Sequence, residues 1–218
     1  MCTNSLITCG YVLLMACGVT LSALALFYPA GIIIDKASPI FKNCITQGDA
    51  SDPCNKANEI LSSDIIPFSC SFASLFNILD SKDFTKFDNK CKDYMDKVDD
   101  KIKTIWYSAA IGVGISAIGI IAGVIVIVVF SCCACLRVIP MIALTILGLA
   151  LTAVMAAFVI CYHDKWDYLQ DETTRLIPAL QGTNMFQNTF WFGIGATAAG
   201  GVSAILAFLG IFTSFSCC

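Results

Sequence analysis

Four long stretches of this 218-residue chain contain no Asp, Glu, Lys or Arg, and this feature constrains the fold more than any other. Of the 29 charged residues, 28 lie in two blocks, 35–103 and 164–175, and Arg137 is the other one. Each uncharged stretch is longer than the roughly 20 apolar residues that cross the hydrocarbon core of a bilayer. The chain therefore has room for four membrane spans.

Helices are the expected form of these spans, because inside lipid only helices and closed barrels satisfy every backbone hydrogen-bonding group. The sequence lacks the alternating strands of about ten residues that build a barrel. We therefore predict an all-α membrane protein, a four-transmembrane-helix bundle that occupies residues 1–218 as a single domain. The predicted spans lie near residues 8–33, 106–131, 138–161 and 190–214. Between them lie outer loop one (35–105), a cytoplasmic turn (132–137) and outer loop two (162–189).

The first span differs from a secretory signal peptide, although it is N-terminal and apolar. The segment from Met1 to Gly10 contains no basic side chain. The largely apolar run from Tyr11 to Ile34 exceeds the apolar region of about 7–15 residues that such a peptide carries. We therefore expect this segment to be a membrane helix.

Composition and charge exclude several classes of protein. Hydrophobic residues make up 57% of the chain, charged residues 13%, and the mean hydropathy is +0.79, which excludes disorder and disfavours a soluble domain. A net charge of −3 gives no electrostatic support for binding nucleic acid. The predicted spans contain no charged residue, which disfavours transport coupled to buried ions. His163 is the only histidine, and it lies beside Asp164 near Asp167 without a recognisable catalytic motif, so we expect neither an enzyme nor a cofactor.

Seven cysteines at one predicted membrane face indicate which side is cytoplasmic. Juxtamembrane cysteines are the usual substrates of S-palmitoylation, a cytoplasmic modification, whereas a single such cysteine also suits packing at a helix end. The Lys and Arg count points the other way, with twelve in the outer loops and one in the turn, but this bias weakens in long loops. We therefore place both termini in the cytoplasm, and the chain in the plasma membrane or an organelle of the secretory pathway. The palmitoylation candidates are Cys2, Cys9, Cys132, Cys133, Cys135, Cys217 and Cys218.

Outer loop one contains four dispersed cysteines, at Cys44, Cys54, Cys70 and Cys91. An even number of cysteines in a polar loop predicts two disulfides in an oxidising compartment, with three connectivities open. The alternative is a four-cysteine zinc site, but the loop lacks the Cys-x2-Cys pairs typical of such sites, so no metal is expected. Two other cysteines stand apart from these sets: Cys161 is left free or joins the loop framework, and Cys17 is expected to be buried within the first span.

Hydrophobic periodicity predicts that outer loop one is helical. Apolar residues recur every three or four positions from Phe84 to Ile105, and no Pro or Gly separates them from the second span. We therefore expect one continuous helix from about Asp83 to Ser131. Together with a shorter helix that starts near Pro53, it forms a small helical, disulfide-tied extracellular cap.

Outer loop two shows the same helical period. Tyr162, Trp166, Leu169 and Thr173 share one stripe, so the third span is expected to continue to about Leu176. After this point Pro and Gly break the helix, at Pro178 and Gly182. Aromatic residues are expected at the outer membrane interface as generic anchors. They are Trp106, Trp166, Trp191, Tyr28, Tyr107 and Tyr162.

Small residues recur at helical spacing in the second and fourth spans. Such rows let helix backbones approach closely and therefore predict helix contacts, inside one bundle or between subunits. For the second span we favour contacts within one chain. The helix-packing candidates are Gly112, Ser116, Gly119 and Gly123, and then Gly193, Thr197 and Gly201.

The order of these elements resembles the four-span proteins of the claudin-like group. The shared features are short cytoplasmic ends, a large first outer loop, a smaller second loop and cysteines at the inner face. The use of cysteine is also similar to that of tetraspanins. The Leu-Trp-x-x-Cys arrangement of claudins and the Cys-Cys-Gly motif in a large loop between spans three and four, typical of tetraspanins, are absent. The resemblance therefore implies a tetraspan membrane protein without a more specific family.

These features together predict a structural or accessory tetraspan membrane protein. We expect it to organise membrane, or to assemble with itself or another membrane protein through its outer loops and small-residue helix faces. The expected partners are the lipid bilayer, covalent acyl chains, and either further copies of the chain or another membrane protein. The alternative is an oligomeric pore or channel subunit whose conduit is lined by Thr189, Thr197 and Ser203 of the fourth span.

Overall fold

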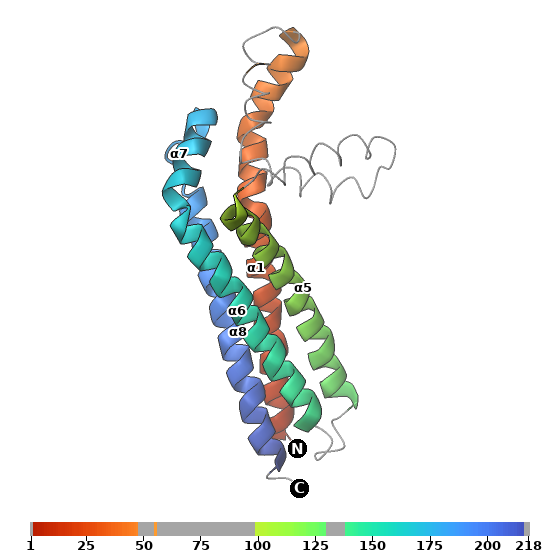
Figure 1. The fold of residues 1–218 in the computed structure, drawn as a ribbon. Coiled ribbons are helices and arrows are strands. Elements are labelled where there is room, and N and C mark those ends of the chain that lie inside the picture. The colour runs from red at the N-terminus through yellow and green to blue at the C-terminus, as the bar shows by residue number, and fades with distance from the viewer. Residues whose placement is uncertain (1, 48–54, 56–98, 130–137, 216–218) are drawn as a thin grey trace. The chain divides into compact units, whose positions relative to one another are not determined.

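A computed structural model shows a chain built from long helices (Figure 1). It describes residues 2–47, 55, 99–129 and 138–215. In these ranges the structure has no β-strand, which confirms the predicted all-α class. The helices in chain order are α1 (Cys2–Gln47), α5 (Asp100–Val129), α6 (Val138–Asp164), α7 (Trp166–Leu176), the short 3-10 helix η2 (Pro178–Leu180) and α8 (Met185–Phe215).

Four of these helices are long and apolar enough to cross a membrane. The prediction of four such helices is confirmed, and the fold is compatible with an integral membrane protein. Most of outer loop one, which carries the predicted disulfide-tied cap, lies outside the described residues. The candidate spans are Leu6–Ile40 of α1, Asp100–Val129 of α5, Val138–Asp164 of α6 and Met185–Thr213 of α8.

Helix α1 is longer than the uncharged stretch from which it was predicted. It continues through Asp35 and Lys36 and contains two prolines, which usually mark a helix end or a kink. The helix persists because its apolar face continues past the charged pair: Ile33 and Ala37, four residues apart, are both buried. The first charged residue therefore marks the end of the apolar segment and not the end of the helix.

The third long helix bends where one continuous helix was expected. Helix α6 ends at Asp164, Lys165 adopts a turn conformation, and α7 continues to Leu176, the predicted end. The backbone bonds on both sides of the bend survive, since the Lys165 N–H donates to the Cys161 carbonyl and the Leu169 N–H donates to the Lys165 carbonyl. The turn after α7 follows the predicted breakers, because Pro178 opens η2 and Gly182 has a φ of +80°.

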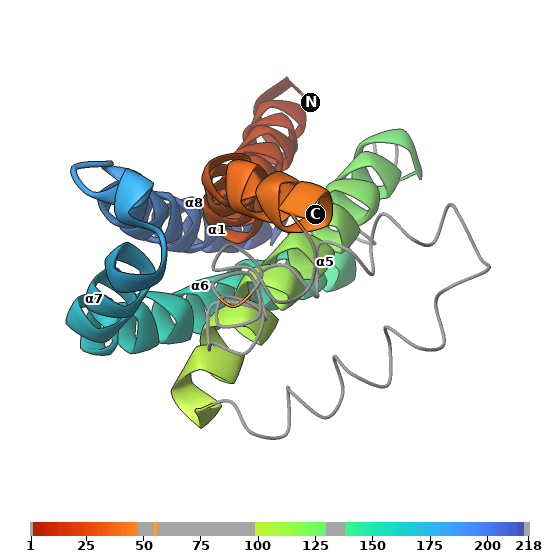
Figure 2. The same cartoon turned by 90° about the horizontal axis from the view of Figure 1, so that it is seen from above.

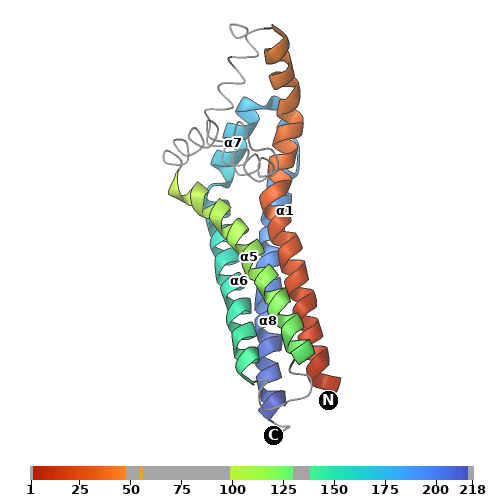
Figure 3. The ribbon, with the colours of Figure 1, turned by 90° about the vertical axis from the view of Figure 1, so that its right-hand side faces the viewer.

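The chain divides into two compact units, and unit 1 is a four-helix bundle. Unit 1 comprises Met1–Ala25, Tyr107–Val159 and Trp191–Cys218, so α1, α5, α6 and α8 each contribute to it. The four helices lie side by side in two views, and α1 begins at the end of the bundle where α8 ends (Figures 1 and 3). Large side chains fill the interior of the bundle, and they include Tyr11, Met15, Met141, Leu144, Leu151, Met155 and Phe158, all at most 1% exposed.

Unit 2 comprises Leu26–Trp106 and Ile160–Phe190. Its described part contains the second half of α1, the first turns of α5, the last turn of α6, all of α7 and η2, and the first turns of α8. Helix η2 folds back against α7 (Figure 2). Outer loop two is therefore a folded helical segment.

In unit 1 the backbones of α6 and α8 approach each other closely. A Cβ atom added at Gly148 would lie 2.7 Å from the backbone nitrogen of Ala204, and one added at Gly200 would lie 2.8 Å from the backbone nitrogen of Thr152. A backbone atom cannot rotate away as a flexible side chain can. The absence of a side chain at Gly148 and Gly200 therefore sets the distance between these two helices.

We predict that Gly200→Val destabilises the protein by about 1–3 kcal/mol, because the new side chain overpacks the contact between α6 and α8. The matched control is Gly114→Val, since Gly114 also lies inside a long helix but is exposed, with no atom within 4 Å of an added Cβ. Denaturation of the purified protein in lipid or detergent, followed by circular dichroism, measures both variants. Equal stability of the two variants would contradict the contact.

Candidate functional site

Two ion pairs join the start of α5 to the bend between α6 and α7. The Lys165 ammonium lies 2.7 Å from the Asp99 carboxylate, and the Lys101 ammonium pairs with the Asp164 carboxylate. Because all four side chains keep contact with water, each pair is expected to contribute only about 0–1 kcal/mol. The two pairs cross-link the end of outer loop one to the beginning of outer loop two, so they fix geometry more than they add stability.

Asp99 has a second role as the cap of α5. Its Oδ1 accepts the backbone N–H of Lys101 at 2.8 Å, which satisfies one of the free N–H groups in the first turn of the helix. The pKa of the Asp99 carboxyl is lowered from its ordinary value of 3.8, first by the hydrogen bond from Lys165 and then by the bond from the Lys101 backbone. Asp99 is therefore ionised throughout the physiological range.

An aromatic cluster holds α7 against the first turns of α8. The rings of Tyr162 and Trp166 meet edge to face with centroids 6.0 Å apart, and Trp166 meets Phe190 in the same way at 5.8 Å. The Tyr162 hydroxyl donates to the backbone carbonyl of Phe186 at 3.3 Å. Edge-to-face pairs of this kind contribute about 0.5–1.5 kcal/mol beyond the area they bury.

Four of the six predicted aromatic anchors divide into two groups, and the other two, Trp166 and Tyr28, are half-buried. Tyr107 and Trp191 are 55% and 58% exposed, as interface anchors should be, whereas Trp106 and Tyr162 are at most 4% exposed and serve internal packing. Trp106 and Tyr162 are therefore packed inside the protein, and their position at a membrane interface stays a prediction. The i,i+4 spacing of Tyr162 and Trp166 is the sequence signal that indicates a packed pair on one helix face.

Helix α7 is amphipathic. Its buried face carries Leu169 and Thr173, which belong to the predicted stripe, and also Leu176. The opposite face is exposed and carries Asp167 and Tyr168, with the Lys165 ammonium 5.7 Å from the centroid of the Tyr168 ring. This face presents a charged group and an aromatic group.

The predicted small-residue row on α5 packs within the chain. A Cβ at Gly112 would lie 2.6 Å from the sulfur of Met155, and a Cβ at Gly119 would lie 2.8 Å from the methyl group of Met15. A flexible buried methionine therefore fills each of these notches. The two remaining members of the row are also buried: Gly123 faces Val12 of α1, and the Ser116 hydroxyl donates to the Gly112 carbonyl.

The predicted row on α8 coincides only partly with the tight contacts. A Cβ at Gly193 would lie 2.6 Å from the Phe158 ring, but a Cβ at Gly201 would make only an ordinary contact with Thr152 at 3.8 Å. The close approach of the two backbones lies one residue earlier, at Gly200. Neither Gly200 nor its counterpart Gly148 was predicted from the sequence. The available signal was a pair of matching small-residue repeats, Gly148 with Thr152 and Gly200 with Ala204, each four residues apart.

The hydroxyls proposed to line a pore are bonded inside α8. Thr189 donates to the Met185 carbonyl, Thr197 to the Gly193 carbonyl and Ser203 to the Gly200 carbonyl, at 2.8–2.9 Å. Thr189 in unit 2 and Ser203 in unit 1 have no exposed surface. Bonding to the helix's own carbonyls is how hydroxyls are tolerated in apolar surroundings.

The three cysteines whose side chains the structure describes are free thiols. Cys9 and Cys17 of α1 are exposed and Cys161 of α6 is half-buried. The expectation that Cys17 is buried is wrong, because Met15 and Gly18 take the inward positions of that turn and leave Cys17 on the outer face.

The remaining candidate cysteines are not described at the level of side chains. Cys2 and Cys44 lie in α1, but their side chains are outside the described part of the structure. The other predicted disulfide partners, Cys54, Cys70 and Cys91, lie outside the described residues, as do the palmitoylation candidates Cys132, Cys133, Cys135, Cys217 and Cys218.

The only histidine and its acidic neighbours lie at the bend between α6 and α7. His163 is exposed and packs its ring against Phe190 with centroids 6.1 Å apart, while Asp164 is engaged with Lys101. Across the described ranges, no three His, Cys, Asp or Glu side chains are grouped so that they could hold a metal ion.

Comparison of the chain with protein-family models, curated proteins and solved structures finds no significant match.

The lowered pKa of Asp99 predicts how acid acts on this cluster. A depressed carboxyl pKa contributes stability above about pH 4, and this contribution is lost as the pH falls through the folded-state pKa. We expect Asp99→Asn, which retains a capping oxygen and loses the charge, to be less stable than the parent chain by a constant amount from pH 7 to about pH 5. Below about pH 4 the difference should shrink towards zero.

Denaturation of both chains across this pH range measures the effect. An Asp99→Asn chain that is as stable as the parent chain at pH 7, or more stable, would contradict the ion pair between Asp99 and Lys165.

Proposed function

We propose that the chain is a structural or accessory tetraspan membrane protein that assembles with itself or with another membrane protein through its outer loops. The observation that carries this proposal is the exposed face of α7. The helix is held in place by its buried face and by the aromatic cluster, so the opposite face, with Asp167 and Tyr168, is an ordered surface. Tyrosine at an ordered surface is typical of protein interfaces, where it supplies contact area at little entropic cost.

The exposed apolar side chains of the long helices support the lipid bilayer as the environment of the protein. Large aliphatic and aromatic residues are exposed along all four of these helices, for example Leu13 on α1, Ile118 on α5, Ile146 on α6 and Phe212 on α8. A soluble monomer rarely exposes so much contiguous apolar surface. Because α1 begins where α8 ends, we propose that both termini lie on one side, in the cytoplasm, in the plasma membrane or an organelle of the secretory pathway.

The packing of the small-residue rows favours assembly through the loops over assembly through the spans. The notches at Gly112, Gly119, Gly123 and Gly193 are filled by side chains of the same chain. These faces are therefore occupied in the folded chain and are not required for contacts between copies. The hydroxyls that suggested a pore are bonded within α8, and they lend the pore alternative no support.

We also propose that Cys9 carries an acyl chain. It is a free, exposed thiol in the early turns of α1, where a cytoplasmic acyltransferase meets a membrane helix. Cys17 is also free and exposed, but it lies eight residues further along α1, which is about 12 Å of helix at 1.5 Å per residue. At that depth a thiol of a membrane span is out of reach of the interface.

Cys9→Ser is therefore expected to lower the hydroxylamine-sensitive acyl label of the protein, and Cys17→Ser is expected to leave it unchanged. Acyl exchange on protein isolated from its native cells, with mass-tag labelling of each released thiol, measures both variants. An unchanged label in Cys9→Ser, or a label lost in Cys17→Ser, would overturn the assignment.

Site-specific photocrosslinking tests the proposed assembly surface. A benzoylphenylalanine at position 168 should form adducts with protein, either a second copy or a partner, because the α7 face is proposed to contact protein. The matched control is position 107, an exposed tyrosine inside the apolar part of α5, where adducts with lipid are expected. Both sites carry a native tyrosine with similar exposure, 45% at Tyr168 and 55% at Tyr107.

Gel shifts and mass spectrometry after irradiation of intact membranes distinguish protein adducts from lipid adducts. Protein adducts at position 168 that outnumber those at position 107 would support assembly through outer loop two. Lipid adducts alone at both positions would contradict it.

A further inference from the structure

A hollow of about 440 Å³ opens between α7 and the segment that leads from η2 into α8. All of its lining residues belong to unit 2. Leu180 and Phe186 form its apolar floor and are 1% and 8% exposed. Its volume falls in the range of roughly 300–1,000 Å³ that is typical of sites for small ligands. The assembly proposed above does not account for this hollow.

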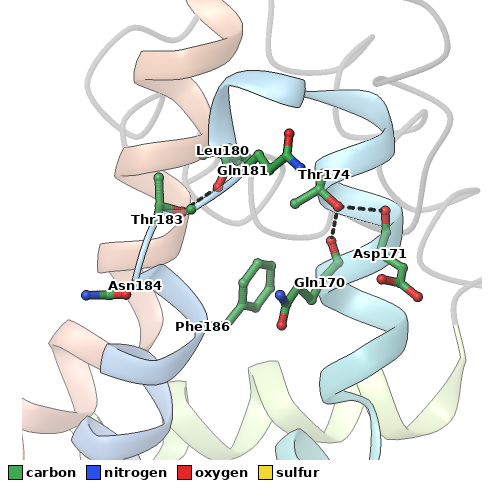
Figure 4. Close-up of a pocket in the computed structure, with 9 residues that line it drawn as sticks. Gln170, Asp171, Thr174, Leu180, Gln181, Thr183, Asn184 and Phe186 are labelled. Atoms are coloured by element: carbon green, nitrogen blue, oxygen red, sulfur yellow. Dashed lines mark hydrogen bonds between the residues drawn. The ribbon is translucent and has the colours of Figure 1, made fainter.

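Polar groups stand around this floor in an ordered arrangement. Figure 4 shows the Phe186 ring and the Gln170 amide beside each other at the base, Thr174 above them on α7, and the Gln181 amide reaching towards Thr174 from the opposite side. The groups come from two separate segments of outer loop two. The fold of that loop, rather than one turn of helix, therefore creates the hollow.

The hydrogen bonds within the wall decide what each polar group offers to a ligand. The Gln170 Oε1 accepts the indole N–H of Trp166 at 3.0 Å, which leaves the amide nitrogen of Gln170 to donate. The Thr174 hydroxyl donates to the Gln170 carbonyl at 2.8 Å, which leaves its lone pairs to accept. The hollow thus presents a fixed donor and a fixed acceptor over an aromatic floor.

This combination discriminates between chemical classes of ligand. None of the lining residues is basic, so a phosphate, sulfate or carboxylate would have no cation to pair with. A cation would be repelled by the N–H donor of Gln170 at the base. The single carboxylate of the lining, Asp171, is exposed to water and would therefore attract a cation only weakly. A hydroxyl group both donates and accepts, so it matches Gln170 and Thr174 together.

We propose that this hollow binds a neutral polyhydroxylated ligand, the pyranose ring of a glycan. The C–H face of the ring would pack on Phe186, and its hydroxyls would bond to Gln170, Thr174 and Gln181. The ring comes from a glycolipid headgroup or from the glycan of a glycoprotein, which present the same chemistry. The site is independent of the proposed assembly through α7, because a purified single copy contains all of its residues.

The test uses the full-length protein in nanodiscs. Saturation-transfer NMR with the methyl glycosides of galactose, glucose, mannose and N-acetylglucosamine detects binding of a free sugar. Native mass spectrometry of nanodiscs that contain galactosylceramide detects binding of a headgroup. Binding of at least one sugar in either arm is expected, and the arm with the tighter binding identifies the source.

Variants then locate the binding. Thr174→Val and Gln181→Ala should each weaken binding by about three- to tenfold, the effect of losing one hydrogen bond to a ligand. Gln181→Ala alters an exposed side chain in a turn and is expected to leave the fold intact. Weaker binding by this variant therefore reports a lost contact with the ligand and not misfolding. The matched control is Gln187→Ala, an exposed glutamine of α8 outside the hollow, which should bind as the parent chain does.

Three results would overturn the proposal. The first is no binding of any of the four glycosides or of galactosylceramide. The second is binding that none of the lining variants weakens. The third is binding of arginine methyl ester, lost in Asp171→Asn, in place of sugar binding, which would make the hollow a cation site.

Discussion

The bundle of unit 1 depends on glycines whose missing side chains are replaced by groups of the same chain. The backbones of α6 and α8 meet at Gly148 and Gly200, where an added Cβ would lie less than 3 Å from backbone atoms of the other helix. Elsewhere the notches are filled by side chains, with Met15 opposite Gly119 and Met155 opposite Gly112. In apolar surroundings this close packing, and not the hydrophobic effect, is what favours one helix contact over another.

The polar groups of the molecule are arranged differently in the long apolar helices and in the loops. Inside unit 1 the hydroxyls of Ser116 and Ser203 donate to carbonyls of their own helices. These buried hydroxyls therefore need no hydrogen-bond acceptor on another helix. Ion pairs and side-chain amides gather in unit 2, where Asp99 and Lys165 connect the two loops. We therefore place both proposed sites, the assembly surface and the glycan site, in outer loop two.

The sequence was sufficient for the helical class, the four long apolar helices and the buried stripe of α7, because each depends on a local pattern of charge or period. It was insufficient where the outcome depends on which neighbour a residue meets. Cys17 was expected inside the bundle and faces outward, since the rotation of α1 is set by Met15 and Gly18. The bend at Lys165 was missed for the same reason, because Asp99, its ion-pair partner, lies 66 residues away in the chain. Likewise, Gly201 was predicted as a helix-packing residue, but the close contact between α6 and α8 is made at Gly200.

Whether the glycine notches are filled from within one chain is open to measurement by disulfide trapping. Val12 and Gly123 suit the purpose, because a Cβ at position 123 would lie 2.5 Å from a methyl carbon of Val12. In a chain freed of its native cysteines, Val12→Cys and Gly123→Cys together should form a disulfide within each copy. Copies with only one substitution each, mixed in the same membrane, should form no dimer. Abundant disulfide dimers in the mixed membrane would contradict packing within one chain and would place these glycines between copies.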